Sequence, residues 1–127
     1  TEEVSEMERL VAAGDEASLI AAIAIENDNV EAVTALALLL VERSSEGDRE
    51  AALKLLERIP ESAETRRIAA MARVEPVEDV ETTLAELLPT VKDDDEARQR
   101  FVDLLEVLGP EDPRTAEWRR RLTSTLF

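Results

Sequence analysis

The sequence of 127 residues contains no cysteine, no histidine and no tyrosine, and its aromatic residues are one tryptophan and two phenylalanines. Without cysteine or histidine the chain has no disulfide, no thiol redox chemistry, no histidine general base and none of the usual zinc ligand sets. These absences exclude most familiar catalytic arrangements. We therefore expect no enzymatic activity, no metal site and no cofactor.

Glycine is also scarce, with three residues, and the sequence has no long apolar run. The apolar residues are mainly alanine and leucine, which favour helix, and the alternation of β-branched or aromatic residues that strands need is missing. With 44% hydrophobic and 35% charged residues, the composition indicates an all-α chain that neither spans a membrane nor is disordered. The length predicts a single domain over residues 1–127.

Charge is distributed unevenly. The net charge is −15, and it is concentrated in residues 1–96, whereas residues 97–127 are close to neutral. Such an acidic chain repels phosphate groups and anionic lipid, so nucleic acid and membrane surfaces are not expected partners. The sequence begins at Thr1 without a basic and apolar signal segment. We expect a piece of a longer cytoplasmic protein.

Apolar residues recur at helical spacing in eight segments separated by breaks. The third segment, Val30–Glu42, is apolar on most of its circumference and should be the most buried helix. In the seventh, the run Asp93-Asp94-Asp95 supplies capping side chains rather than a calcium loop, since the alternating ligands of such a loop are missing. That seventh helix ends at Gly109-Pro110. The first helix runs from Val4 to Gly14, the second has its apolar stripe from Leu19 and ends at about Glu26, and the apolar face of the fourth includes Ala51 to Ile59, before Pro60. The remaining predicted helices are 61–73, 76 to Pro89, and 113–127.

The breaks also repeat. Ala13-Gly14-Asp15 and Glu46-Gly47-Asp48 are 33 residues apart, and this offset places Leu19 on Ala52 and Ile23 on Leu56. A looser third copy, at an offset of 31, places Asp79 on Asp48 and Leu84 on Leu53. These spacings are close to the 34-residue tetratricopeptide period. The expected fold is therefore an array of helical hairpins, built from about seven or eight helices of degenerate tetratricopeptide-like repeats in a right-handed solenoid.

The aromatic residues all lie in the last 27 positions, together with the only run of three basic residues, Arg119-Arg120-Arg121. On a helical wheel Trp118, Leu122 and Leu126 share one face, and Arg120 and Phe127 point the opposite way. The first face should pack inward, with Trp118 closing the end of the repeats. Phe127 either folds back or stays exposed as an anchor for a partner.

The arginines have two possible roles that can both hold. They can offset the dipole at the end of the last helix, or they can recognise carboxylates on a partner.

A longer string in the tail resembles one family closely, the YbbN-type thioredoxin-like co-chaperones, or chaperedoxins. The matching residues are Ala97-Arg98, Phe101, Leu104-Leu105, Leu108-Gly109-Pro110, Asp112-Pro113, Arg119-Arg120-Arg121-Leu122 and Leu126-Phe127. The middle of the chain is similar as well, through Leu56-Glu57-Arg58-Ile59-Pro60 and Glu64-Thr65-Arg66. The resemblance runs from Val11 onward.

Members of that family join a thioredoxin-like domain to a C-terminal tetratricopeptide-like domain, hold unfolded clients and deliver them to a GroEL-type chaperonin. The resemblance implies unfolded clients and this chaperonin as protein partners. It also implies that the docking residues are Trp118, Arg119, Arg120, Arg121, Leu122, Leu126 and Phe127. Two features depart from the family: the thioredoxin-like domain is absent from this chain, and the segment between Arg73 and Asp93 is shorter.

A second interpretation is a structural or oligomerisation module whose tail pairs with another copy. Self-repulsion of the acidic chain favours a monomer, although a dimer through the near-neutral tail is possible. An acid pair of the glycosidase type is not expected, because no aromatic residue precedes Phe101 to form a sugar platform.

Overall fold

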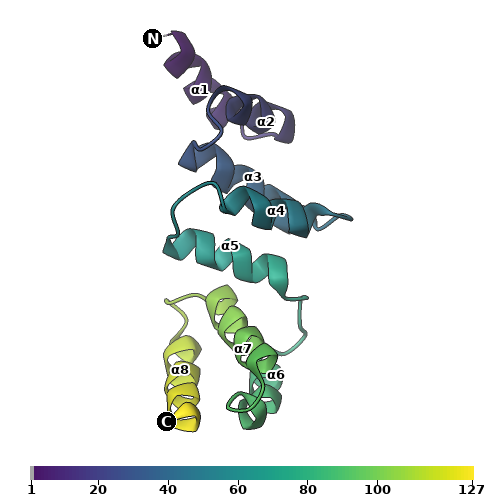
Figure 1. The fold of residues 1–127 in the computed structure, drawn as a ribbon, viewed down its shortest axis with the longest axis vertical. Helices are drawn as coiled ribbons and strands as arrows, with labels where there is room; N and C mark the ends of the chain where they lie inside the picture. Colours follow the sequence, from purple (N-terminus) through teal and green to yellow (C-terminus); the bar gives the residue numbers. More distant parts are fainter. Residues whose placement is uncertain (1) are drawn as a thin grey trace. The chain divides into compact units, whose positions relative to one another are not determined.

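The computed structural model describes residues 2–127, and the side chains from residue 6 onward. Thr1, where the predicted single domain begins, lies outside the described residues. Eight α-helices and one short 3-10 helix account for the secondary structure of the described part (Figure 1), and no strand occurs there. The elements are α1 Glu2–Ala13, α2 Glu16–Ile25, α3 Val30–Arg43, α4 Asp48–Leu56, α5 Ala63–Arg73, α6 Val80–Leu87, η1 Leu88–Thr90, α7 Asp95–Leu108 and α8 Pro113–Leu126.

The helices form two compact units, Thr1–Ala72 (unit 1) and Arg73–Phe127 (unit 2). In unit 1 each of α1, α2 and α3 packs on the helix that follows it, and in unit 2 α7 packs on both α6 and α8. Each unit has its own hydrophobic cluster. The all-α helical-repeat prediction is confirmed, whereas the single domain stays a prediction.

The core of unit 1 is centred on α3. Seven of its residues are buried, more than in any other described helix, as the apolar circumference of Val30–Glu42 predicts. The first repeat register is confirmed too. Leu19 and Ala52 are both almost fully buried, and Gly14 and Gly47 precede their helices with φ angles of 71° and 82°.

An ion network joins three helices of unit 1. The Arg43 guanidinium, at the end of α3, donates to both carboxylate oxygens of Asp48 on α4, at 2.8 and 2.9 Å, and also to Glu16 on α2. Asp48 is buried and accepts a further hydrogen bond from the backbone N–H of Ser45 at 2.9 Å. Arg43 holds the pKa of Asp48 below its usual range. The network fixes the turn between α3 and α4.

Three predicted helix boundaries are wrong. The fifth helix begins at Ala63 rather than Glu61. The sixth helix begins at Val80 rather than Pro76, because the carboxylate of Asp79 accepts from the backbone N–H groups of Glu81 and Thr82. The same helix ends at Leu87, just before Pro89, as predicted. Pro89 itself lies in the first turn of η1, where its missing N–H would be unpaired anyway.

The fourth helix ends at Leu56 rather than Ile59. The backbone N–H of Ile59 bonds to the carbonyl of Leu56 at 3.4 Å, which is a tighter turn than an α-helix allows. Ile59 is nevertheless buried in the core of unit 1.

The third repeat copy is one residue out of register. Leu84 of α6 is fully buried, whereas Leu53, its predicted counterpart, is only partly buried. The residue of α4 that matches Leu84 in burial is Ala52, 32 positions earlier. Because Leu84 is larger than Ala52, the buried position beside α6 needs more space than the equivalent position beside α4.

In unit 2 the end of α7 and the start of α8 are defined by Gly109 and Asp112. Gly109 follows α7 with φ 87° and ψ 158°, and Asp112 caps α8 by accepting from the N–H of Arg114 at 2.9 Å. The buried hydroxyl of Thr115 donates to the carbonyl of Gly109 at 2.6 Å. At the other end of α7, Asp94 caps the helix as the aspartate run predicts.

Candidate functional site

One face of α8 belongs to the core of unit 2. Thr115, Trp118 and Leu122 are buried, and Leu126 is half-buried against the same cluster. These positions are three or four residues apart, so they lie on one side of the helix. The prediction that Trp118, Leu122 and Leu126 pack inward is confirmed.

Trp118 is held on three sides. Its ring meets Phe101 of α7 edge to face, with centroids 6.2 Å apart and an interplanar angle of 68°. Its indole N–H donates to Oε1 of Glu81 on α6 at 3.4 Å. The guanidinium carbon of Arg121 lies 4.5 Å from the ring centroid. Trp118 therefore connects all three α-helices of unit 2 and is 6% exposed.

Of the two roles predicted for the arginine triplet, the structure does not support offsetting the dipole at the end of the helix. The last turn of α8 contains no basic residue, and the dipole effect fades beyond that turn. Arg120 and Arg121 instead pair with Glu117, one turn earlier, and Arg121 also covers Trp118. Within the part of the chain that the structure describes, the Arg119 guanidinium has no ion pair or hydrogen bond.

Phe127 is 98% exposed, which answers the question that the helical wheel left open. Its backbone N–H bonds to the carbonyl of Thr123 at 3.0 Å, so the chain continues in the helical register up to this residue. Phe127 does not fold back onto the core. An exposed aromatic ring at the end of a helix that also carries exposed arginines is a surface that can anchor a protein partner.

The candidate docking residues thus separate into two groups. Arg119, Arg120 and Phe127 are exposed, and we call them the α8 strip. Trp118 and Leu122 are buried, so they hold α8 in place rather than face solvent. Arg121 and Leu126 lie at the border between the two groups. A binding role of all seven residues stays a prediction.

The surroundings of the N-terminus of α8 are acidic. Asp112 accepts from Arg114, and this ion pair holds the pKa of the Asp112 carboxyl below its usual range while raising that of Arg114. Asp79, which caps α6, also has a lowered pKa, chiefly because the Thr82 hydroxyl and backbone donate to it. These carboxylates stay charged at neutral pH, and Asp112 offsets the positive charge of Arg114.

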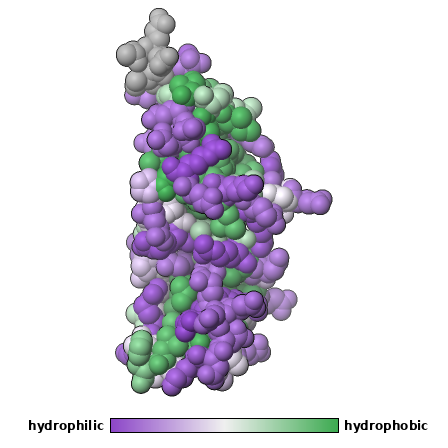
Figure 2. Space-filling model, viewed as in Figure 1, coloured by the Kyte–Doolittle hydropathy of each residue, from purple (hydrophilic) through white to green (hydrophobic). Residues whose placement is uncertain are grey.

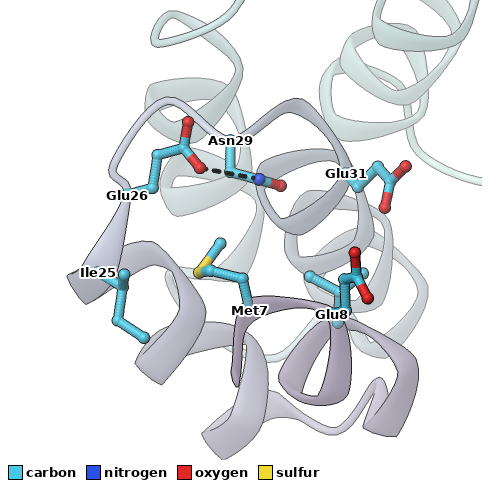
Figure 3. A pocket seen from close by; sticks show the side chains of 7 residues that line it. Met7, Glu8, Ile25, Glu26, Asn29 and Glu31 are labelled. Atoms are coloured by element: carbon cyan, nitrogen blue, oxygen red, sulfur yellow. Dashed lines mark hydrogen bonds between the residues drawn. The ribbon is translucent and has the colours of Figure 1, made fainter. Parts of the chain in front are cut away.

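Unit 1 contains a pocket that the sequence did not predict (Figure 3), with a volume of about 450 Å³. Apolar side chains of α1 and α2 and three glutamates form its walls. The lining residues are Met7, Glu8, Val11, Ile25, Glu26, Asn29 and Glu31. Met7 and Val11 recur at helical spacing in the sequence, but that spacing does not indicate a pocket. α1 lies against the turn between α2 and α3, and no short stretch of the sequence predicts this tertiary contact.

Unit 2 has a second hollow, lined by side chains of both charges around Asp103. Asp103 is buried and accepts hydrogen bonds from Arg73 at 3.3 Å and Gln99 at 3.0 Å. Because Asp103 already accepts from two side chains and the lining contains both acidic and basic residues, this hollow favours no particular ligand charge.

Hydrophilic residues cover most of the face in Figure 2. No described helix is both long and apolar enough to cross a bilayer. The described residues also include no group of three or more side chains placed to hold a metal ion.

The sequence model of one protein family, described as "Tetratricopeptide repeat", matches residues 10–127. The match covers the repeats of unit 1 and the whole of unit 2. No curated protein and no solved structure is significantly similar to the chain.

Proposed function

The chain belongs to the tetratricopeptide repeat family, and on that premise we propose that it docks on a partner protein through the α8 strip. Tetratricopeptide repeats generally mediate protein–protein interaction, and domains of this type are typically non-catalytic. The observation that carries the proposal is the 98% exposure of Phe127 at the end of a helix whose opposite face is buried. The core fixes the direction in which the strip points.

We further propose a specific partner class. The tail string resembles that of chaperedoxins, and this supports the proposal that the chain is the C-terminal part of a cytoplasmic thioredoxin-like co-chaperone. Its partners would then be unfolded clients and a GroEL-type chaperonin. Phe127 would enter an apolar groove on the chaperonin, while Arg119 and Arg120 pair with carboxylates at the rim of that groove.

Deleting the whole of α8 would remove Trp118 from the core, so point substitutions test the proposal better. The variant Arg119→Glu, Arg120→Glu, Phe127→Ala changes only exposed side chains. We expect it to bind purified GroEL-type chaperonin roughly 10- to 30-fold more weakly, because it loses an aromatic anchor and reverses two charges. Biolayer interferometry with immobilised chaperonin measures the affinity.

The matched control changes the same kinds of side chain in unit 1. Arg58→Glu, Arg67→Glu, Ile20→Ala alters three exposed residues outside α8 and should bind like the unchanged protein. Circular dichroism must give the same helical signal for both variants. Equal chaperonin binding by the α8 variant and the unchanged protein would rule out docking through this strip.

A further inference from the structure

The pocket of unit 1 has an apolar floor that is partly open to solvent. Met7 is buried, Val11 is half-buried, and Ile25 is 42% exposed despite its large aliphatic side chain. In Figure 2 hydrophobic residues gather over α1 and α2. Leaving such surface in water is unfavourable by about 25 cal/mol per Å². A partner side chain that covers the floor would therefore gain free energy.

The rim of the pocket is negatively charged. Figure 3 shows Met7 near the centre, with Glu26 on one side and Glu8 and Glu31 on the other. No basic side chain lines the pocket, and none of these three glutamates forms an ion pair among the described residues. Three unpaired carboxylates around one apolar floor repel each other, and a cation between them would relieve that repulsion.

One of the carboxylates is held in position. Oδ1 of Asn29 caps α3 by accepting from the N–H of Ala32 at 2.9 Å, while its Nδ2 donates to Oε2 of Glu26 at 3.1 Å. The side chain of Glu26 is thus tied to the start of α3 instead of moving freely. A preformed acceptor reduces the entropy that a ligand must remove on binding.

We propose that this pocket binds an extended peptide segment of a partner protein in which a lysine or arginine is adjacent to a large aliphatic residue. The aliphatic residue and the methylene stem of the basic side chain cover Met7 and Ile25. The cationic end reaches Glu26 and the glutamates of the opposite wall. Lysine and arginine combine both properties in one side chain, and a pocket of about 450 Å³ accommodates one or two side chains rather than a whole helix.

Other ligand classes fit the pocket less well. Nucleic acid and anionic small molecules are repelled by its three carboxylates. A bare metal ion fits less well, because these carboxylates do not form a group placed to hold a metal, and no such group occurs among the described residues. A second copy of this chain would bring net charge −15 against net charge −15, so self-association is opposed except through its few basic residues. The pocket lies in unit 1 and the α8 strip in unit 2, so this site is additional to the proposed docking function.

Synthetic peptides carrying a fluorophore test the chemistry of the occupant. We expect a short peptide of alternating leucine and lysine to bind, as measured by fluorescence anisotropy. Peptides of alternating leucine and glutamate, or serine and lysine, should bind at least about tenfold more weakly, because each lacks one of the two required features. Equal binding of the serine–lysine peptide would mean non-specific attraction to an acidic protein and would overturn the proposal.

Substitutions locate the binding site. Glu8→Gln, Glu26→Gln, Glu31→Gln removes the rim charges and should weaken binding of the leucine–lysine peptide by roughly tenfold. The control Glu57→Gln, Glu61→Gln, Glu64→Gln removes the same charge from exposed positions of unit 1 outside the pocket and should leave affinity unchanged. Equal effects of the two variants would contradict a site at this pocket.

Ile25→Ala tests the floor, and should weaken the same peptide without changing the helical circular dichroism signal. Sedimentation velocity at several concentrations tests whether a second copy of the chain occupies the pocket instead. If the unchanged protein self-associates and the pocket variant does not, the occupant is a second copy and the partner-peptide proposal is wrong.

Discussion

The guanidinium of Arg121 lies over the ring of Trp118, with its central carbon 4.5 Å from the ring centroid. The two residues are three positions apart on α8, so they belong to the same side of the helix. This contact divides the arginine triplet, because Arg121 covers the core residue Trp118 while Arg119 and Arg120 stay exposed. The triplet therefore contains both a stabilising residue and candidate binding residues.

Arg121→Gln should lower the free energy of unfolding by roughly 0.5 to 1 kcal/mol, because it removes a cation–π contact at a partly exposed site. Arg119→Gln, at a position without such a contact, should leave it nearly unchanged. Urea denaturation followed by circular dichroism measures both. The fluorescence spectrum of Trp118 should shift only in the Arg121 variant, and identical spectra and stabilities would show that the contact is absent in solution.

Trp118→Ala should destabilise the protein by about 3 to 5 kcal/mol, because it leaves a large cavity beside Phe101. Phe127→Ala removes an aromatic side chain from the same helix but from a fully exposed position, and should change stability by less than about 0.5 kcal/mol. Thermal and urea denaturation give the comparison. Similar destabilisation by both substitutions would contradict the burial of one ring and the exposure of the other.

The ion pair of Arg43 and Asp48 predicts a dependence of stability on pH. The pKa of Asp48 is lowered in the folded state, below its unfolded value of about 3.9. The stability that the charged Asp48 carboxylate contributes is fully present above the unfolded pKa, and it is lost as pH falls through the folded pKa. Arg43→Gln should therefore destabilise the protein at neutral pH, and its difference from the unchanged protein should shrink as Asp48 becomes protonated.

Urea denaturation between neutral and acidic pH measures the difference in the free energy of unfolding between Arg43→Gln and the unchanged protein. Carboxyl NMR should also show the pKa of Asp48 rising in the Arg43 variant. Arg58→Gln, at an exposed position outside the network, controls for the loss of one positive charge. A difference between Arg43→Gln and the unchanged protein that is constant with pH would contradict the assigned cause.

Gly109 and Gly47 allow backbone strain to be separated from crowding. A methyl group added at either position would meet no atom within 4 Å. Gly47 has φ 82° and ψ −10°, whereas Gly109 has φ 87° and ψ 158°, a region that is essentially limited to glycine. Gly109→Ala should cost about 3 kcal/mol of stability and Gly47→Ala about 1 kcal/mol. Chemical denaturation measures both, and the reverse order would contradict these backbone angles.

Local signals in the sequence predicted most of the helices correctly. Asp94 and the pair Gly109-Pro110 bound the seventh helix as expected, because capping and helix termination depend on residues that are adjacent in sequence. The wrong start of the sixth helix at Pro76 also has a local origin. A proline fits a first helical turn but does not supply the carboxylate that starts α6 at Asp79.

The candidate site was only partly predictable. The helical wheel correctly predicted that Trp118 and Leu122 face the core, but it did not predict that Arg121 covers the indole ring. It also could not decide the exposure of Phe127, which depends on whether another part of the chain reaches the end of α8. Burial of a terminal side chain is a property of its neighbours in space.

By itself the sequence determined the all-α class, the 33-residue repeat of the first two copies and the inward face of the last helix, since helical periodicity and capping are local. The tertiary structure decided where α1 meets the turn between α2 and α3, and therefore the acidic pocket around Met7. It also decided which arginine covers Trp118. Both outcomes depend on how side chains from separate helices fill the space between them, and no short stretch of sequence contains that information.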